Sequence, residues 1–232
     1  PRTPHLFQHI DTTCFRMSKT LLDACYGSYK GGRIAHKNVF FHAVAVKNNY
    51  NIEHFTKFPE KIVYSDDRYK IYCYWDTGKK GMPPIIKHIF NHNTHIARKI
   101  NRELILLDDT KISNYIDIPR RFFVLKSNFK SDMIRFEVLY KFGGAWIDTD
   151  VLLTGDIFTL LQRDVYLEVE HERKIGCCIL LYKKNTACAR FCCDRIKNIL
   201  KSQKNIQWED LGPRTVQIMY KKFHRNIDLN TT

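Results

Sequence analysis

Two aspartates, Asp148 and Asp150, carry the clearest chemical signal in this 232-residue sequence. They follow the apolar run that begins at Ala145, and we expect a strand over residues 145–153. Side chains two residues apart on a strand leave the same face, so the two carboxylates would form a paired oxygen site. Such a site suits Mn²⁺ or Mg²⁺, with phosphate oxygens and waters as further ligands. Taken alone, the pair is also compatible with two solvated aspartates on an edge strand.

The preceding segment adds another acid and a base. Asp132 and Arg135 are three residues apart and share one face of a helix that we expect over residues 131–142. In the first turn of that helix they would stand near its N-terminus, which together with Arg135 favours phosphate oxygens. Asp132 would accept hydrogen bonds from sugar hydroxyls. The alternatives are a helix-capping role for Asp132 and an ion pair of Arg135 with Asp132 or Glu137.

A glycine pair, Gly143-Gly144, must bring these two sets of residues together. It ends the helix and turns the chain into the strand. A helix of about 12 residues is ~18 Å long, and the strand from 145 to 150 is ~20 Å long. The start of the helix therefore returns beside the end of the strand. Trp146 points to the same side as Asp148, where it packs beneath the site or simply in the core.

Strands and helices alternate along the rest of the chain from Lys70. We expect strands at 69–75, 104–107, 122–125, 165–170 and 175–182, and helices beginning at Pro83 and covering 186–200. This alternation is typical of an α/β sandwich with a mostly parallel sheet. We divide the chain into an N-terminal extension of unknown role, residues 1–69, and one domain, residues 70–232.

The chain is strongly basic, with 38 Lys and Arg against 24 Asp and Glu, a formal net charge of +14. This surplus favours anionic partners such as nucleic acid, acidic lipid or phosphorylated small molecules. A hydrophobic fraction of 44% argues against intrinsic disorder. No apolar stretch approaches the ~18 residues of a transmembrane helix.

Five of the eight cysteines lie between Cys177 and Cys193. Their spacing matches no zinc pattern, because there is no pair of the form CxxC. Buried free thiols are the simplest account, with disulfides and a metal site as alternatives. Reduced thiols point to an intracellular compartment. We expect the cytoplasm of a bacterium or of a virus-infected host, or a Golgi lumen if the sequence is a trimmed ectodomain.

The whole segment 131–150 resembles the core motif of DxD glycosyltransferases of the GT-A fold. It is most similar to the capsular-polysaccharide-synthesis and family-32 group, whose members are mannosyl- or galactosyltransferase-like. The motif S-D-x-x-R-x-x-x-L-x-x-x-G-G-x-[YW]-x-D-x-D is matched at these positions: Ser131, Asp132, Arg135, Leu139, Gly143, Gly144, Trp146, Asp148 and Asp150. The strand that ends in Trp75, the stretch 115–123 and Leu211-Gly212-Pro213 also resemble family elements, so the resemblance covers about residues 70–220.

The resemblance implies a GT-A fold, a Rossmann-like αβα sandwich, and a metal-dependent glycosyltransferase. The donor would be a nucleotide-diphosphate sugar, with a UDP-hexose as the first guess, and the transfer would be retaining. The acceptor hydroxyl would belong to a glycan, a lipid-linked molecule or a protein.

The resemblance also assigns roles to residues. Asp148 and Asp150 would hold the metal, and Asp132, Arg135 and Asp150 would be the catalytic set. Donor contacts would come from Asp132, Arg135, Trp146 and Asp148, with Trp75 stacking on the base. A further metal or phosphate ligand is usual in the C-terminal part, and the candidates there are Glu209, Asp210 and His224.

Other functions are compatible with parts of this pattern. A nucleotidyltransferase or a sugar-nucleotide hydrolase also needs paired carboxylates and a metal. A nucleic-acid-binding module would use the positive charge and the aromatic residues, and we rank it below the enzymes. A catalytically dead GT-A domain that serves as a platform for partners is a third possibility.

Overall fold

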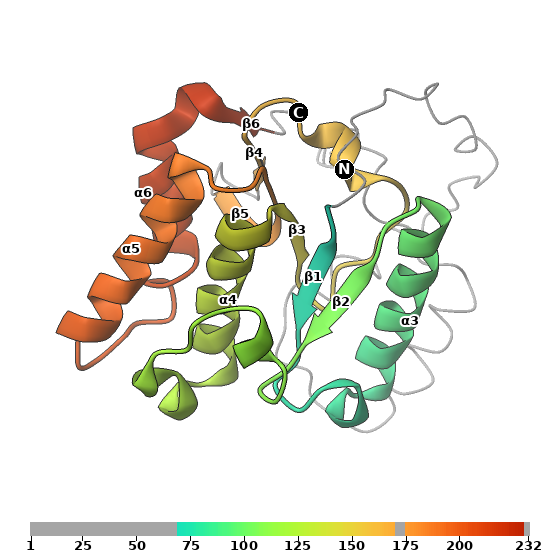
Figure 1. Cartoon of the computed structure of the whole chain (residues 1–232), viewed down its shortest axis with the longest axis horizontal. Coiled ribbons are helices and arrows are strands. Elements are labelled where there is room, and N and C mark those ends of the chain that lie inside the picture. The colour runs from blue at the N-terminus through green and yellow to red at the C-terminus, as the bar shows by residue number, and fades with distance from the viewer. Residues whose placement is uncertain (1–68, 170–174, 230–232) are drawn as a thin grey trace, which may run out of the picture.

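The computed structural model describes residues 69–169 and 175–229 (Figure 1). Apart from Tyr69, the predicted N-terminal extension lies outside these residues. The division of the chain at residue 70 therefore stays a prediction.

A six-stranded mixed sheet forms the centre of the described chain, in the strand order β2-β1-β3-β5-β4-β6. β1 pairs in parallel with β2 and β3, β4 pairs in parallel with β6, and β5 is antiparallel to both of its neighbours. β5 thus runs against the other strands, which confirms the predicted mostly parallel sheet. The strands are β1 (Ile71–Tyr74), β2 (Leu104–Leu107), β3 (Gly144–Ile147), β4 (Val165–Val169), β5 (Ile175–Tyr182) and β6 (Ile227–Leu229).

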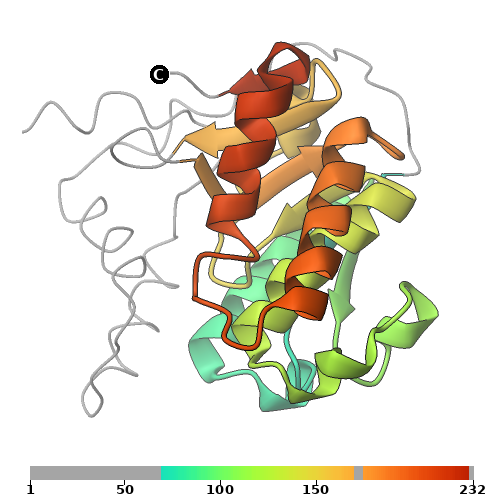
Figure 2. The ribbon, with the colours of Figure 1, turned by 90° about the vertical axis from the view of Figure 1, so that its left-hand side faces the viewer.

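Helices cover both faces of the sheet. The longer ones are α3 (Pro84–Lys99), α4 (Ser127–Phe142), α5 (Ala187–Ser202) and α6 (Pro213–Phe223). Figure 1 shows α3 on one side, and α4, α5 and α6 on the other, and Figure 2 shows α5 and α6 side by side. The predicted α/β class, a Rossmann-like sandwich with a mostly parallel sheet, is confirmed. In the part of the chain that is described, no helix is both long and apolar enough to cross a membrane.

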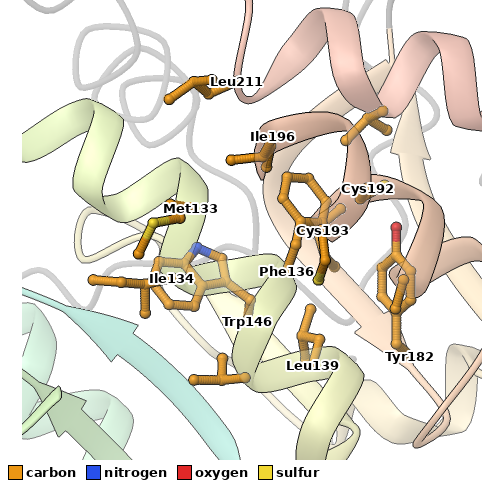
Figure 3. Packing of buried hydrophobic residues seen from close by; sticks show 14 of the residues in the cluster. Met133, Ile134, Phe136, Leu139, Trp146, Tyr182, Cys192, Cys193, Ile196 and Leu211 are labelled. Carbon is orange, nitrogen blue, oxygen red and sulfur yellow. The ribbon is translucent and has the colours of Figure 1, made fainter. Parts of the chain in front are cut away.

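Alternate residues of the strands pack into two separate hydrophobic cores, one on each face of the sheet. Tyr72, Tyr74 and Trp146 belong to the core beneath α4, α5 and α6, which Figure 3 shows around Trp146. Ile71 and Cys73 belong to the core on the α3 side. This follows from the period of two in a strand. It places Trp146 on the α4 side of the sheet, which is the side that carries Asp132 and Arg135.

Helix α4 begins four residues earlier than predicted, at Ser127 instead of Ser131. Nothing in the sequence 127–130 breaks a helix, and the Ser127 hydroxyl donates to the Asp76 carboxylate, which ties this turn to the end of β1. The predicted end is correct: Gly143 has a φ of 67° and its N–H donates to Leu139 O at 2.9 Å. Asp132 and Arg135 therefore lie beyond the first turn, and the expected role for the helix N-terminus beside them is wrong.

The strand predicted at residues 122–125 is also wrong, because these residues belong to a short 3-10 helix, η5 (Arg120–Val124). A strand buries alternate residues, whereas here Phe122 is fully buried and the next two side chains are exposed. The other short 3-10 helices are η3 (Lys79–Gly81), η4 (Ile112–Asn114), η6 (Ile157–Leu160) and η8 (His224–Asn226).

The strand predicted over residues 145–153 ends at Ile147. Residues 148–150 form a turn that is closed by the Val151 N–H donating to Asp148 O at 3.0 Å. The buried Asn93 of α3 then holds the chain, because its amide donates to Val151 O at 2.7 Å and accepts from Leu153 N at 2.8 Å. The two hydrogen bonds of Asn93 fix the backbone directly after the two aspartates against α3.

The cysteines in the described residues are free thiols. Cys188, Cys192 and Cys193 are buried on α5, and Cys177 and Cys178 are half-buried on β5. The prediction of buried free thiols on a strand and the following helix is confirmed for the first three.

Gly144 is the tightest point of the connection between α4 and β3, and its substitution tests this geometry. It has a φ of 105°, and an added Cβ would meet the backbone carbonyl oxygen of Lys70. That oxygen accepts the N–H of Ala145 at 3.0 Å, so it cannot move without loosening β1 from β3. We expect Gly144→Ala to lower the free energy of unfolding by about 2 kcal/mol or more in urea denaturation.

Gly81→Ala is the matched control for this substitution. Gly81 lies outside the left-handed region, and the obstacle to its Cβ is the side chain of the exposed Thr77. Rotation of Thr77 does not remove the obstacle, because its Cβ would lie 2.6 Å from the added one. Both residues are exposed in a short turn that can shift without disturbing the sheet, so we expect a smaller loss than at Gly144. Equal losses at both positions would contradict the assigned strain at Gly144.

Candidate functional site

The predicted site residues gather at the carboxyl edge of the parallel strands. Trp75 directly follows β1, Asp108 directly follows β2, and Asp148 directly follows β3. In open α/β sheets, ligands bind in the crevice outside this edge. The topology therefore gives these residues a common place for chemistry.

Asp148 is held by the residue two positions before it on β3. The indole N–H of Trp146 donates to Asp148 Oδ1 at 2.8 Å. The Asp148 backbone N–H donates to Cys178 O at 2.8 Å, so pairing with β5 continues past the end of the strand. Trp146 is fully buried, and it packs beneath the site as one of the two predicted arrangements had it.

Arg135 joins the helix to the strand. Its Nη2 lies 3.0 Å from Asp132 Oδ1 and 3.3 Å from Asp148 Oδ1. The predicted proximity of Asp132 and Arg135 to Asp148 is therefore correct. The lengths agree because the helix from Asp132 to Phe142 spans ~15 Å, and the chain from Gly144 to Asp148 spans ~13 Å.

Further donors of Arg135 bond to other groups of the protein. Nη1 donates to the Cys177 carbonyl oxygen of β5, and Nη2 donates to the Ser131 hydroxyl at 3.1 Å. The guanidinium carbon lies 5.3 Å from the centre of the Trp146 ring, and the side chain is 5% exposed. This arrangement makes Arg135 a residue that orients Asp148. Its predicted contact with a phosphate stays a prediction.

Gly212 closes the other side of Asp132. A Cβ at Gly212 would lie 2.5 Å from Asp132 Oδ1 and 2.8 Å from Oδ2. Only a residue without a side chain leaves room for this carboxylate. The Gly-Pro element at the start of α6 is one of the elements that resemble the family. It is part of the wall around Asp132.

The protonation of this cluster is shifted. Burial raises the pKa of Asp132 to about 6, against the opposing effect of Arg135. Burial also raises the pKa of Asp148, which Arg135 and the Trp146 hydrogen bond oppose. Burial acts to lower the pKa of Arg135, but the charges of Asp148 and Asp132 outweigh it and raise that pKa. The guanidinium therefore stays charged between two carboxylates.

Asp150 lies in the turn after β3 and not on the strand, so the expected shared strand face is wrong. It is half-buried, and among the described residues it has no hydrogen-bond or ion-pair partner. Its charge raises the pKa of Asp148, which shows that the two carboxylates are close enough to interact.

The carboxylates at this edge offer few ligands for a divalent metal ion. The described residues contain no group of three or more His, Cys, Asp or Glu side chains arranged to hold one. Two oxygen donors are still present, because the contacts of Asp148 use only Oδ1 and leave Oδ2, and Asp150 is unpaired within the described part. Hard cations that keep waters and bind phosphate oxygens need few protein ligands. Asp148 and Asp150 therefore fit a hard divalent cation that takes its other ligands from waters and phosphate oxygens.

The other predicted candidates are placed as follows. Trp75 is half-buried, and its backbone N–H donates to Leu107 O at 3.0 Å. Both Asp210 oxygens are used within the protein, by the Gln207 N–H at 2.8 Å and by Arg214 at 2.5 Å. Glu209 and His224 are exposed. The predicted roles of these residues toward a ligand stay predictions.

A second polar cluster at the ends of β1 and β2 was missed from the sequence. The Tyr74 hydroxyl and Lys130 of α4 both donate to the Asp109 carboxylate. Beside it, burial acts to raise the pKa of Asp108, but hydrogen bonds from Lys111 and Thr110 hold that pKa below its usual range. The signal was the pair Asp108-Asp109 directly after a buried strand. This cluster fixes the first turns of α4 against the sheet.

The fold and the site together define an α/β protein with a buried carboxylate–guanidinium–carboxylate cluster at the carboxyl edge of its sheet. The family model described as "Capsular polysaccharide synthesis protein" matches residues 32–176, more than half of the chain. The chain therefore belongs to the capsular polysaccharide synthesis protein family. The match includes α4, β3 and both aspartates after β3, and it begins inside the segment predicted as an extension.

Other comparisons add little. No curated protein matches the chain. Among solved structures, the chain is similar to the PaToxG glycosyltransferase, with 18% identity, a TM-score of 0.44, and coverage of 67% of this chain and 68% of that one. No residue role is transferred from it.

The contact of Gly212 with Asp132 predicts an energetic coupling between the two positions. Gly212→Ala places a methyl group against the Asp132 carboxylate, and we expect it to cost about 1–3 kcal/mol of stability. In an Asp132→Ala background the obstacle is gone, so the same substitution should cost much less. Urea denaturation of the four proteins measures this coupling. Additive losses would show that the two residues do not touch.

The raised pKa of Asp132 predicts a pH-dependent stability difference. The native carboxyl binds its proton more tightly than in the unfolded chain, where the pKa is ~3.9. The wild type therefore loses stability as the pH rises from about 4 to about 6. Asp132→Asn lacks this loss, so its stability relative to wild type should rise through that range and then level off. Denaturation curves at several pH values test this, and a constant or falling difference would contradict it.

Proposed function

We propose that this protein is a metal-dependent glycosyltransferase that moves a hexose from a nucleotide-diphosphate sugar to an acceptor hydroxyl. Its membership of the capsular polysaccharide synthesis protein family supports a glycosyltransferase role. One observation carries the proposal: Asp148 is fixed through Oδ1 at the end of β3, and its other oxygen remains available beside the unpaired Asp150.

The charge of the cluster supports a metal-dependent donor site. Asp132, Asp148 and Asp150 supply three carboxylates, against the one guanidinium of Arg135, so the cluster carries more negative than positive charge when ionised. A diphosphate would be repelled from such a place unless a cation bound with it. Asp148 and Asp150 would hold Mn²⁺ or Mg²⁺, which when bound would offset the charge of the diphosphate and of the leaving nucleotide.

The other residues would act on the donor as follows. Arg135 is largely buried, so we assign it a positioning role in which it keeps Asp148 ionised and oriented. Trp75, at the end of β1, is the residue that we propose to stack on the base. Asp132 would accept hydrogen bonds from donor hydroxyls.

The identity of the substrates rests on the resemblance of the sequence motif. We propose a UDP-hexose as donor, a hydroxyl of a glycan, a lipid-linked molecule or a protein as acceptor, and retention at the anomeric carbon. Release of free nucleotide and sugar without any acceptor would instead favour a sugar-nucleotide hydrolase.

Calorimetric titration with UDP and GDP, each with and without Mn²⁺, tests the donor site. We expect metal-dependent binding of one nucleotide by the wild type. Asp150→Asn should weaken that binding at least tenfold and abolish sugar transfer without changing the thermal stability. This follows because it replaces one of the two oxygen ligands with an amide of the same size.

Asp164→Asn is the matched control for this experiment. Asp164 is a half-buried aspartate, like Asp150, that lies 3.5 Å from Lys183 and immediately precedes β4, at the opposite edge of the sheet from Asp150. This variant should bind the nucleotide as the wild type does. Equal, metal-independent binding by the wild type and Asp150→Asn would overturn the metal site. Salt-sensitive binding of nucleic acid, with no nucleotide binding, would overturn the transferase.

A further inference from the structure

Three large apolar side chains stand exposed in the described part of the chain. They are Phe123 at 66%, Val124 at 82% and Trp208 at 67% exposure. Phe123 and Val124 belong to η5, and Trp208 lies in the connection from α5 to α6. Large apolar side chains that are exposed together on a surface often mark an interaction site.

Arg121 joins the two segments that carry these side chains. Its guanidinium lies between η5 and the end of α5, where it donates to the carbonyl oxygens of Leu200, Gln203 and Lys204. η5 and the α5–α6 connection are therefore neighbours, although they are about 80 residues apart in sequence. We call the surface formed by residues 120–126 and 201–208 the rim.

The rim lies at the same edge of the molecule as the candidate site. η5 leads into α4, whose first residue bonds Asp76 at the end of β1. The α5–α6 connection ends at Gly212, which contacts Asp132. Figures 1 and 2 show both segments at the same end of the molecule.

The exposed charges around the rim are mainly positive. Across residues 117–128 and 201–214, the exposed acidic residues are Asp117 and Glu209, and Glu209 lies 3.7 Å from Arg214. The exposed basic residues of the same ranges are Arg120, Lys126, Lys201, Lys204 and Arg214.

We propose that the rim attaches the protein to an anionic membrane surface. Trp and Phe side chains favour the boundary between headgroups and acyl chains, and each nearby Lys or Arg adds about 1 kcal/mol of attraction to an anionic leaflet. The rim offers both kinds of side chain on short loops beside the site. This inference is independent of the proposed donor and metal. It explains where part of the basic surplus acts.

Sedimentation with lipid vesicles tests the proposal. The full chain should bind vesicles of phosphatidylcholine with 30% phosphatidylglycerol at least tenfold more tightly than vesicles of phosphatidylcholine alone. The combined variant Phe123→Ser, Val124→Ser and Trp208→Ser should lose most of this binding. Its thermal stability should be unchanged, because the three side chains are exposed.

Two charge variants separate the rim from the overall charge. Lys126→Ser with Lys204→Ser removes two positive charges from the rim. Lys183→Ser with Lys184→Ser removes two from exposed positions just after β5, at the opposite edge of the sheet. Only the first pair should weaken vesicle binding, by about thirtyfold. Equal effects of the two pairs would overturn the proposal, because they would indicate attraction by net charge alone.

Tryptophan fluorescence gives a second readout. Trp208 is exposed, whereas Trp146 is fully buried, so vesicle binding should shift the emission to the blue in the wild type but not in Trp208→Phe. Absence of vesicle binding would overturn the proposal. So would full retention of binding by the triple serine variant. Binding of the rim to RNA or to another protein, with none to vesicles, would also overturn it and assign a different partner.

Discussion

The ion cluster in which Arg135 lies between Asp132 and Asp148 is the interaction on which the site depends. Burying charged groups costs several kcal/mol for each ion, and the cost is offset only when every donor finds an acceptor. Here the guanidinium reaches two carboxylates, a serine hydroxyl and a carbonyl oxygen of β5. The cluster thereby fixes α4, β3 and β5 relative to one another at the edge where a ligand would bind.

Backbone constraints prepare the place for this cluster. Gly143 and Gly144 have positive φ and bring α4 back along β3 in a very short connection. Gly212 lets the start of α6 approach the Asp132 carboxylate. Each glycine is needed because a Cβ would meet a backbone atom or a charged group. The spacing of the motif is therefore a consequence of packing as much as of chemistry.

The sequence predicted the elements whose signals are local. β2, β5 and the glycine end of α4 are where the apolar runs and the Gly-Gly pair placed them. The sequence-based prediction was wrong for elements whose bounds or type depend on tertiary contacts. The helix was expected to begin at Ser131, but the Ser131 hydroxyl accepts from Arg135 inside the helix. The run after Arg121 looked like a strand, but Phe123 and Val124 are both exposed, and within the described residues no strand pairs with it.

The same distinction applies to function. The motif predicted that Asp132, Arg135 and Asp148 meet, because matching helix and strand lengths require it. It did not predict that Arg135 would be buried, since burial depends on β5 and on α6, which are remote in sequence. Arg135 is 5% exposed and pairs with both Asp132 and Asp148, so its guanidinium orients Asp148. The oxygens of Asp148 and Asp150 that the described contacts leave available are the groups from which we propose that chemistry at this edge starts.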